Sequence, residues 1–311
     1  MRVATIDIGT NTVLLLVAEV ADSGGLEAVE ERATITRLGE GVDRTRHLSP
    51  VAIERTSSCL GNYAHRIREL AVDRVAVVGT SAMRDAGGGD EIRAQVRSLL
   101  GVDARVLSGG EEARLTFRGA LSGLPHDQRE DVAVFDVGGG STEIVIGRSE
   151  PLDQIHFAES FDVGSVRLTE RYIEHDPPTL AERQQVAAAA KDAFARVPPL
   201  PAHLHPVGIA GTVTTLAAVS LGLAPYDGKR VHGHVMARDE VAQVVDRLAG
   251  LPLVVRAGVA GMEPKRADVI LAGGAIVLSL LDRWSATAVR VSDRGVRWGL
   301  AEEIAGESGS A

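Results

Sequence analysis

The sequence predicts an α/β protein with two lobes of similar architecture, each built on a mixed β-sheet flanked by helices. The first observation is a repeated unit, strand–Asp–x–Gly turn–strand, which reads TIDIGTNTVLLLV at residues 5–17 and FDVGGGSTEIVIG at residues 135–147. The second is that three predicted strands precede alternating helices and strands in each half, a pattern typical of α/β domains with mixed sheets. The chain has 311 residues, 45% of them hydrophobic, which is enough for two cores.

The first half begins with three predicted strands within residues 2–36, interrupted by turn residues at 9–11 and 23–25. The elements that follow are predicted as a helix from Pro50 towards Leu70, a strand at 74–79, a helix at 89–100, a strand at 104–107 and a helix at 109–122. A polar, proline-containing connector, GLPHDQRED, comes next. We place the domain boundary there, which gives domains 1–124 and 125–311.

The second half repeats this plan. Its elements are predicted as strands at 131–136, 142–148 and 153–161, helices at 164–173 and 179–196, a strand at 206–210, helices at 211–220, 238–249 and 264–282, a strand at 287–291 and a last helix from 295. The terminal segment GESGSA, residues 306–311, is expected to be disordered.

Composition excludes several functional classes. The net charge of −9 argues against non-specific binding to nucleic acid or anionic membranes, and the 3% aromatic content argues against stacking platforms for single-stranded nucleic acid. No stretch is apolar over a membrane-spanning length, and the N-terminus enters a strand rather than a signal peptide. The single cysteine, Cys59, excludes an intrachain disulfide and is interpreted as a small buried hydrophobe. We therefore expect a cytoplasmic protein.

The three consecutive glycines Gly138, Gly139 and Gly140 predict a phosphate-binding turn. Without Cβ atoms, successive N–H groups can converge on an anion. The alternative is an ordinary tight hairpin turn. The neighbouring residues favour phosphate, because a carboxylate precedes the glycines and Ser141 follows them.

Acidic side chains beside these turns predict a metal site. Asp136 ends one strand, and Glu143 shares a face of the next strand with Ser141. Asp7 occupies the matching position in the first copy of the repeat. Carboxylates next to a phosphate site suit Mg²⁺ or Mn²⁺. His232 and His234 form an H-x-H pattern, but two histidines without a third ligand make a poor zinc site.

A third glycine turn, GIAGTVTTLAAV at residues 208–219, leads from a predicted strand into a helix. Gly211 and Thr212 could bind a phosphate or a ribose hydroxyl at the helix N-terminus. The alternative is an ordinary turn in which Thr212 is the helix cap.

Together these segments resemble the exopolyphosphatase / guanosine pentaphosphate phosphatase family, within the superfamily of actin, hexokinase and the heat-shock ATPases. The resemblance covers residues 1 to about 303. Its motifs in this chain are IDIGTNT, VGTSAMRDA, SGGEEARLTFRGAL, VFDVGGGSTEIVIG, YDGKRVHGHVM, RADVILAGGAIVL and VSDRGVRWGL. Two departures are Gly87–Gly89, where the family commonly has asparagine, and Trp298, where it often has glutamate.

The resemblance implies two actin-like (ribonuclease H-like) lobes, each with a mixed five-stranded sheet, and an active site in the cleft between them. It implies Mg²⁺ or Mn²⁺ as cofactor, a homodimer, and a short, two-lobe member without helical C-terminal domains. The site residues that it implies or supports are, for phosphate binding, Gly9, Thr10, Asn11, Thr12, Arg84, Gly138, Gly139, Gly140, Ser141, Gly211 and Thr212; for the metal, Asp7, Asp136 and Glu143; and for catalysis, Glu112 and Glu143.

The two adjacent glutamates of SGGEEAR receive different predicted roles. Ser108 and Glu111 fit a capping box, in which the glutamate reaches back to the N–H group of the cap residue. Glu112 is then available for catalysis, and it is the residue that the resemblance implies as the base. Two solvated glutamates favoured by the helix dipole are the alternative.

Three functions follow as hypotheses. The first is an exopolyphosphatase, which hydrolyses the terminal phosphoanhydride of inorganic polyphosphate. The second is a phosphohydrolase that acts on guanosine pentaphosphate by the same chemistry. The third, of another class, is a non-hydrolytic actin-like nucleotide-binding or assembly module. The glutamates at 111 and 112 favour a hydrolase over the third hypothesis.

Overall fold

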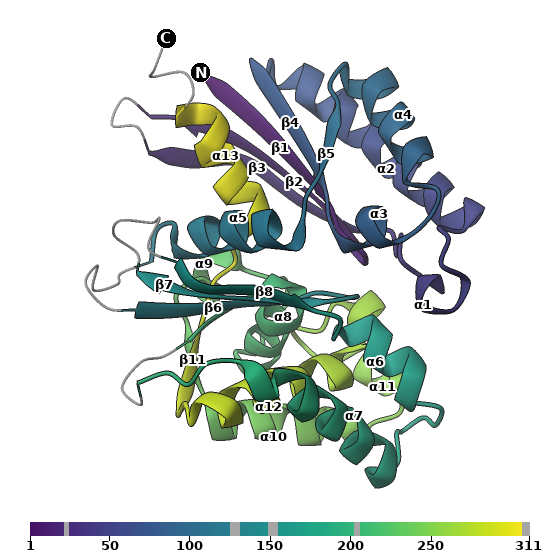
Figure 1. Cartoon of the computed structure of the whole chain (residues 1–311), viewed down its shortest axis with the longest axis vertical. Coiled ribbons are helices and arrows are strands. Elements are labelled where there is room, and N and C mark those ends of the chain that lie inside the picture. The colour runs from purple at the N-terminus through teal and green to yellow at the C-terminus, as the bar shows by residue number, and fades with distance from the viewer. Residues whose placement is uncertain (22–24, 125–130, 149–154, 202–205, 307–311) are drawn as a thin grey trace. The chain divides into compact units, whose positions relative to one another are not determined.

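The computed structural model describes residues 1–21, 25–124, 131–148, 155–201 and 206–306 (Figure 1). It contains two compact units, Met1–Gly119 with Val296–Ala311, and Ala120–Gly295. The units therefore differ from the predicted continuous ranges 1–124 and 125–311, because the last helix belongs to the first unit. The central part of the predicted connector and most of the predicted tail lie outside the described residues.

The first unit contains a five-stranded mixed sheet in the order β3-β2-β1-β4-β5. Its strands are β1 (Arg2–Ile8), β2 (Thr12–Val20), β3 (Leu26–Ile35), β4 (Arg74–Gly79) and β5 (Ala104–Val106). The first three pair antiparallel, whereas β1, β4 and β5 run parallel to one another. Six of the seven residues of β1 are buried, as expected for a central strand covered on both faces.

The helices of this unit follow the predicted pattern, with additions. They are α1 (Val42–Thr45), α2 (Pro50–Glu69), α3 (Ser81–Asp85), α4 (Gly89–Leu100) and α5 (Gly109–Leu121). Helix α2 begins as its sequence dictates, because the Ser49 hydroxyl accepts from the N–H group of Ala52 and proline occupies the first turn. Helices α1 and α3 were not predicted, since five residues or fewer show no helical periodicity.

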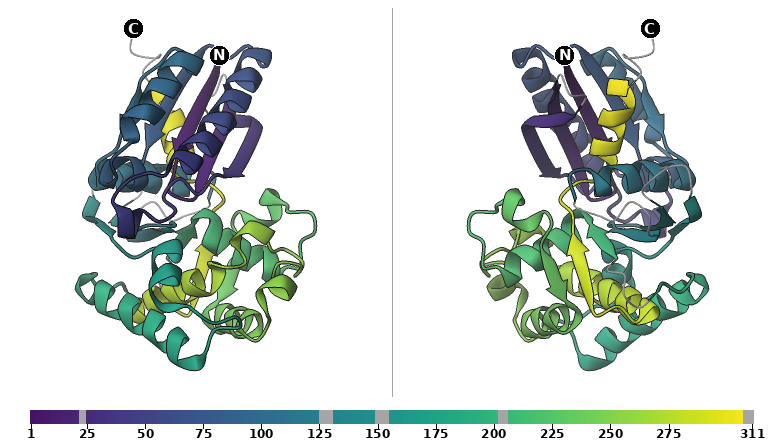
Figure 2. Two further views of the ribbon diagram at one scale, coloured as in Figure 1. Left: turned by 90° about the vertical axis from the view of Figure 1, so that its right-hand side faces the viewer. Right: turned by 90° about the vertical axis from the view of Figure 1, so that its left-hand side faces the viewer.

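The C-terminal helix α13 (Val296–Gly306) completes the first unit. Its Trp298 and Ala301 are buried against Val3, Leu16 and Ala18 of β1 and β2. In both views of Figure 2 the yellow helix lies beside the purple N-terminal strands. Helix α13 also packs closely against α5 at Gly299, where a Cβ atom would lie 2.1 Å from the carbonyl oxygen of Leu115. No larger residue fits at that crossing.

The second unit repeats the topology of the first. Its sheet has the order β10-β11-β9-β6-β7-β8, with strands β6 (Asp131–Val137), β7 (Thr142–Arg148), β8 (Ile155–Phe161), β9 (Val207–Ile209), β10 (Val235–Ala237) and β11 (Ala288–Val291). Read in the opposite direction, its first five strands are β8-β7-β6-β9-β11, and they correspond in order to β3-β2-β1-β4-β5 of the first sheet. The predicted five-stranded sheet is wrong by one strand here, because β10 adds to the edge. Strand β10 has only three residues, of which only Met236 is buried, so its sequence is too short to show the alternation that predicts a strand.

Helices cover this second sheet, and most of the predicted ones are present. They are α6 (Ser165–Tyr172), α7 (Leu180–Ala193) with the 3₁₀ turn η1 (Phe194–Arg196), α8 (Ala210–Ser220), α9 (Gly228–Val231), α10 (Arg238–Ala249), α11 (Leu253–Arg256), the 3₁₀ turn η2 (Pro264–Arg266) and α12 (Ile270–Trp284). The helix predicted at 264–282 is therefore two elements. None of the described helices is both long enough and apolar enough to cross a membrane.

The start of α7 contains a polar network that stabilises the helix end. Thr179 and Glu182 form a capping box, and the Glu182 carboxylate also accepts from the His175 ring at 2.8 Å and from the N–H group of Glu174 at 2.9 Å. These hydrogen bonds, led by the one from His175, lower the pKa of Glu182 to about 2. The same carboxylate raises the pKa of His175 above its ordinary value of 6.5.

We predict that Glu182→Gln destabilises the protein most between pH 4.5 and 6.5. The folded-state pKa of Glu182 lies below its ordinary value of 4.5, so the contribution of the carboxylate is complete above pH 4.5 and is lost as the pH falls towards 2. The contribution of His175 is complete below pH 6.5 and is lost as the pH rises through its raised pKa. Melting temperatures of both proteins across this range measure the difference. A difference that does not vary with pH would contradict the pairing.

Candidate active site

The two glycine turns of the repeat have the same backbone closure. The N–H group of Gly9 donates to the carbonyl oxygen of Thr12 at 3.0 Å, and that of Gly138 donates to the carbonyl oxygen of Ser141 at 3.0 Å. A Cβ atom on either glycine would lie 2.9 or 3.1 Å from the same oxygen. The repeat predicted from the sequence is therefore also a repeat in structure, and a side chain at this position would press against the backbone of either turn.

The carboxylates beside the turns differ between the two copies. Asp136 pairs with Glu143 across β6 and β7, whereas Asp7 pairs with Leu14 across β1 and β2. Directly opposed residues of neighbouring strands point to the same face of the sheet. The second unit therefore places two carboxylates side by side where the first unit has one, and hard oxygen donors of this kind suit Mg²⁺.

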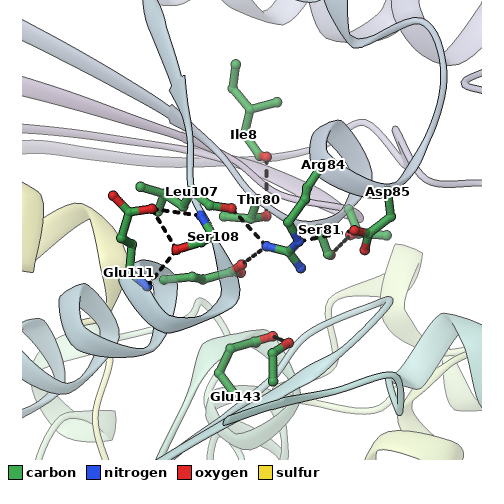
Figure 3. Close-up of polar contacts among 12 residues, drawn as sticks. Ile8, Thr80, Ser81, Arg84, Asp85, Leu107, Ser108, Glu111 and Glu143 are labelled. Carbon is green, nitrogen blue, oxygen red and sulfur yellow. Dashed lines mark hydrogen bonds and ion pairs between the residues drawn. The ribbon is translucent and has the colours of Figure 1, made fainter. Parts of the chain in front are cut away.

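Glu143 is almost fully buried, with 2% of its surface exposed. Its Oε1 atom accepts a hydrogen bond of 2.7 Å from the Ser160 hydroxyl on β8 (Figure 3). This bond fixes the carboxylate's position on the sheet. Ser160 was not predicted as a site residue, because it is 17 positions away from Glu143 and only the strand pairing brings them together.

In the first glycine turn, the Thr10 hydroxyl is bonded to the Ser81 hydroxyl of α3 at 2.7 Å. Asn11 is buried, and Thr12 begins β2. The helix that carries Arg84 is thus linked directly to the predicted phosphate turn. Thr10 and Arg84 were both predicted to bind phosphate, and the bond from Thr10 to Ser81 connects the turn to the helix that carries Arg84.

Arg84 and Glu112 form an ion pair in the first unit. Nη1 of Arg84 lies 2.9 Å from Oε2 of Glu112 and 3.0 Å from the carbonyl oxygen of Leu107, and Nε lies 3.1 Å from Oδ1 of Asp85 (Figure 3). The Glu112 side chain is only 8% exposed. The sequence assigned the arginine to phosphate and the glutamate to water activation, but it gave no signal that they contact each other, because they lie on separate helices.

The predicted capping box of α5 is confirmed. The carboxylate of Glu111 accepts from the N–H group of Ser108 at 3.0 Å, and the Ser108 hydroxyl accepts from the N–H group of Glu111 at 3.3 Å. Hydrogen bonding from Ser108, chiefly from its hydroxyl, lowers the pKa of Glu111. The two adjacent glutamates thus have different contacts, since Glu111 caps the helix while Glu112 is buried and bonded to Arg84.

The third glycine turn is bonded to β6, and its helix cap differs from the alternative interpretation given above. The Thr212 hydroxyl donates to the carbonyl oxygen of Val137 at 3.1 Å, so this side chain ties the turn to β6. Thr212 is also not the helix cap, since α8 begins at Ala210. Gly211 packs against a guanidinium group, because a Cβ atom there would lie 2.0 Å from Cζ of Arg266. The absence of a side chain at Gly211 therefore admits an arginine to the turn.

Comparison with known proteins identifies the family of the chain. The family model described as the Ppx/GppA phosphatase family matches residues 16–307. The chain belongs to the Ppx/GppA phosphatase family. Exopolyphosphatase 2 of Mycobacterium tuberculosis is 40% identical, over 98% of this chain and 99% of that protein. A guanosine-5'-triphosphate,3'-diphosphate pyrophosphatase of Vibrio atlanticus is 28% identical, over 98% of this chain and 59% of that protein.

Solved structures of the Ppx/GppA family share the fold. The crystal structure of the Aquifex aeolicus family member has a TM-score of 0.84 and 34% identity, and the match covers 100% of this chain and 99% of that chain. The predicted family and α/β fold are therefore confirmed. The roles of individual site residues stay predictions.

The metal assignment of this Ppx/GppA family member also stays a prediction. Over the ranges that the structure describes, no group of three or more His, Cys, Asp or Glu side chains is arranged to hold a metal ion. Within the second unit the Asp136–Glu143 pair would hold the ion, which would supply charge neutralisation for phosphate oxygens. That pattern fits Mg²⁺, which keeps several of its waters.

Proposed function

We propose that this Ppx/GppA family member is an exopolyphosphatase, which releases orthophosphate from the end of inorganic polyphosphate in a metal-dependent reaction. The observation that carries the proposal is the buried Glu112 carboxylate held by Arg84 at 2.9 Å, in the unit that also contains a glycine turn. A general base and a phosphate-binding arginine in contact are two of the parts that phosphoanhydride hydrolysis needs. The 40% identity to a protein named exopolyphosphatase 2 supports polyphosphate as the substrate.

In the proposed mechanism, the N–H groups of the two glycine turns bind the terminal phosphate. Arg84 donates to its oxygens, which compete with the Glu112 carboxylate for the guanidinium group. Glu112 then orients a water molecule and accepts its proton as the water oxygen bonds to phosphorus and the bridging P–O bond breaks, which releases the shortened polyphosphate. Asp136 and Glu143, with Asp7, would hold Mg²⁺ or Mn²⁺, which supplies charge neutralisation for the phosphate oxygens.

Guanosine pentaphosphate is the alternative substrate. Its hydrolysis uses the same chemistry with a different leaving group, and the 28% identity to a guanosine-5'-triphosphate,3'-diphosphate pyrophosphatase supports it. A non-hydrolytic nucleotide-binding or assembly module is disfavoured, because the family model that matches the chain is that of a phosphatase family. The higher identity over nearly the whole length of both chains favours polyphosphate.

We further propose that the protein acts in the cytoplasm as a homodimer, without nucleic acid or membrane partners. The single, buried cysteine supports the compartment, and the net charge of −9 supports the lack of nucleic acid and anionic membrane partners. The dimer rests on the family resemblance. Light scattering of the purified chain at several concentrations measures its oligomeric state.

The proposed reaction is tested by phosphate release from short polyphosphate, long polyphosphate, guanosine pentaphosphate and ATP, each with Mg²⁺, with Mn²⁺ and with excess EDTA. We expect polyphosphate to be the preferred substrate and EDTA to slow the reaction at least about tenfold, because carboxylates and an anionic substrate repel each other without a cation. Faster release from guanosine pentaphosphate would support the alternative. Undiminished activity in EDTA, with metal-free reagents, would contradict the metal site.

A further inference from the structure

The carbonyl groups of the second glycine turn are bonded to the start of α6. This helix follows β8 after a short loop (Figure 1). The carbonyl oxygen of Gly138 accepts from the N–H group of Ser165 at 2.9 Å and from its hydroxyl at 3.2 Å. The carbonyl oxygen of Gly139 accepts from the N–H groups of Val166 at 2.9 Å and Arg167 at 3.1 Å. The carbonyl oxygen of Gly140 accepts from Nε of Arg167 at 2.7 Å.

These bonds determine where the N–H groups of the turn point. In a trans peptide the C=O and N–H groups of one plane point in opposite directions. Since the carbonyl groups of three successive planes point towards α6, the N–H groups of Gly139, Gly140 and Ser141 point away from it. The N–H group of Gly138 closes the turn instead. The turn therefore presents three aligned donors, which is the geometry of an anion-binding nest.

Gly164 allows α6 to approach the turn this closely. Its backbone is extended, with φ −138° and ψ 163°, so the conformation itself is open to any residue. A Cβ atom, however, would lie 2.3 Å from the carbonyl oxygen of Gly139 and 2.5 Å from the carbonyl carbon of Gly140. The glycine is needed for contact with the turn rather than for backbone freedom.

Arg167 adds a side-chain donor to these backbone bonds. Its side chain is 15% exposed, and its Nη2 atom lies 3.4 Å from Oδ1 of the exposed Asp162. The Nε–H group therefore donates to Gly140 from a guanidinium group that is largely buried. Charge-assisted hydrogen bonds of this kind are the stronger ones.

The first unit contains the same kind of support, in the segment that follows β3. The carbonyl oxygen of Thr10 accepts from Gly39 N at 2.8 Å, and that of Asn11 accepts from Thr36 N and Arg37 N, both at 3.0 Å. A Cβ atom on Gly39 would lie 2.3 Å from Cγ2 of Thr10. In each unit, the segment after the third strand binds the carbonyl side of the turn, and a glycine makes the contact possible.

We propose that Arg167 and Gly164 are positioning residues for the phosphoryl group. They act through the backbone of the turn, by holding its three N–H groups in the orientation that an anion requires. The inference rests on the proposed function only in taking phosphate as the bound group. Neither residue has to touch the substrate.

Two variants of Arg167 separate this role from a direct charge on the substrate. In Arg167→Gln, the amide nitrogen takes the place of Nε and keeps a donor to Gly140 while the charge is lost. In Arg167→Met, the side chain reaches as far as that of glutamine but has no donor. We expect Met to weaken binding of orthophosphate about tenfold and to lower kcat with tripolyphosphate, because a carbonyl group of the turn loses its partner. Gln should stay within about threefold of the wild type.

Orthophosphate affinity is measured by calorimetry, and kcat and KM are measured with tripolyphosphate. Equal losses in the two variants would overturn the proposal in favour of a direct charge. Wild-type values in the Met variant would overturn it as well. Arg171→Met, on the exposed part of the same helix, is the matched control and should leave both quantities unchanged.

Gly164→Ala tests the same turn without touching an arginine. The added methyl group must displace the turn, and a misplacement of about 1 Å can lower turnover about 100-fold. Far-UV circular dichroism confirms that the variant is folded. A folded variant with wild-type phosphate affinity and kcat would overturn the proposal.

The binding measurement also separates this inference from the proposed function. If the wild type hydrolyses no polyphosphate but binds orthophosphate, and Arg167→Met weakens that binding while Gln restores it, the positioning role stands and the proposed function fails. If the wild type hydrolyses polyphosphate and none of the variants differs from it, the positioning role fails and the proposed function stands.

Discussion

Replacing Glu112 by glutamine is expected to lower kcat for phosphate release by roughly 10²–10⁴-fold, the usual contribution of a general base. An amide keeps the size of the side chain and can still accept from Arg84, whose Nη1 atom lies 2.9 Å from the carboxylate. The change therefore removes basicity while the geometry is kept. KM should change little, since in the proposed mechanism Glu112 acts on the water molecule rather than on the phosphate chain.

Glu111→Gln is the matched control, one residue earlier on the same helix. Its carboxylate is bonded to Ser108, so its loss should act on stability, by about 1 kcal/mol or less, and leave turnover unchanged. Phosphate release and denaturant midpoint are measured for both variants. If Glu111→Gln abolishes turnover and Glu112→Gln keeps it, the two roles are reversed. If neither variant affects turnover, α5 does not take part in the reaction.

Trp298→Ala is expected to lower the free energy of unfolding by about 3–5 kcal/mol, the range for truncating a buried large aromatic residue. Trp298 is 1% exposed and packs against Val3 and Leu16 of the first sheet. Its Nε1–H group donates to Glu31 at 3.3 Å. The variant loses this packing and the hydrogen bond, and it leaves a cavity between α13 and the sheet.

The chain contains two tryptophans, so the variant's fluorescence reports on Trp284 alone, in the core of the second unit. We expect the circular dichroism signal to be lost at lower urea than in the wild type, ahead of the change in Trp284 fluorescence. Trp298→Phe, which fills most of the space, serves as the control. An unchanged midpoint in the alanine variant would show that α13 contributes little to the first unit.

Elements with strong local signals could be predicted from the sequence. Helix α2 has a serine cap followed by proline, and β1 has an uninterrupted apolar run. The helix predicted at 264–282 was less accurate, because a turn separates η2 from α12. Within α12, Gly273 and Gly274 would normally disfavour a helix. A Cβ atom on Gly273 would lie 2.5 Å from Cγ2 of Thr212, and one on Gly274 would lie 2.4 Å from Cγ2 of Val245, so the two glycines allow these side chains to pack against the helix. Tertiary packing here outweighs local propensity.

The candidate site shows the same division. The glycine turns and the capping box of Ser108 lie within a few residues of sequence, so they could be predicted. The ion pair of Arg84 with Glu112, the bond from Ser160 to Glu143 and the bond from Arg167 to Gly140 join residues 17 to 28 positions apart. They depend on how strands and helices pack, which no local pattern encodes.

The return of α13 to the first sheet has a consequence for biosynthesis. Residues 120–295 form one continuous unit, whereas the first unit needs a segment that begins at Val296. The roughly 180 residues in between take about 10–35 s to translate at the usual rate of about 5–20 residues per second. During that time the side chains of Val3, Leu16 and Ala18 lack the helix that buries them. The unit that is made first can therefore complete its fold only last, and its nascent sheet stays accessible to chaperones until α13 has been made and has left the ribosome.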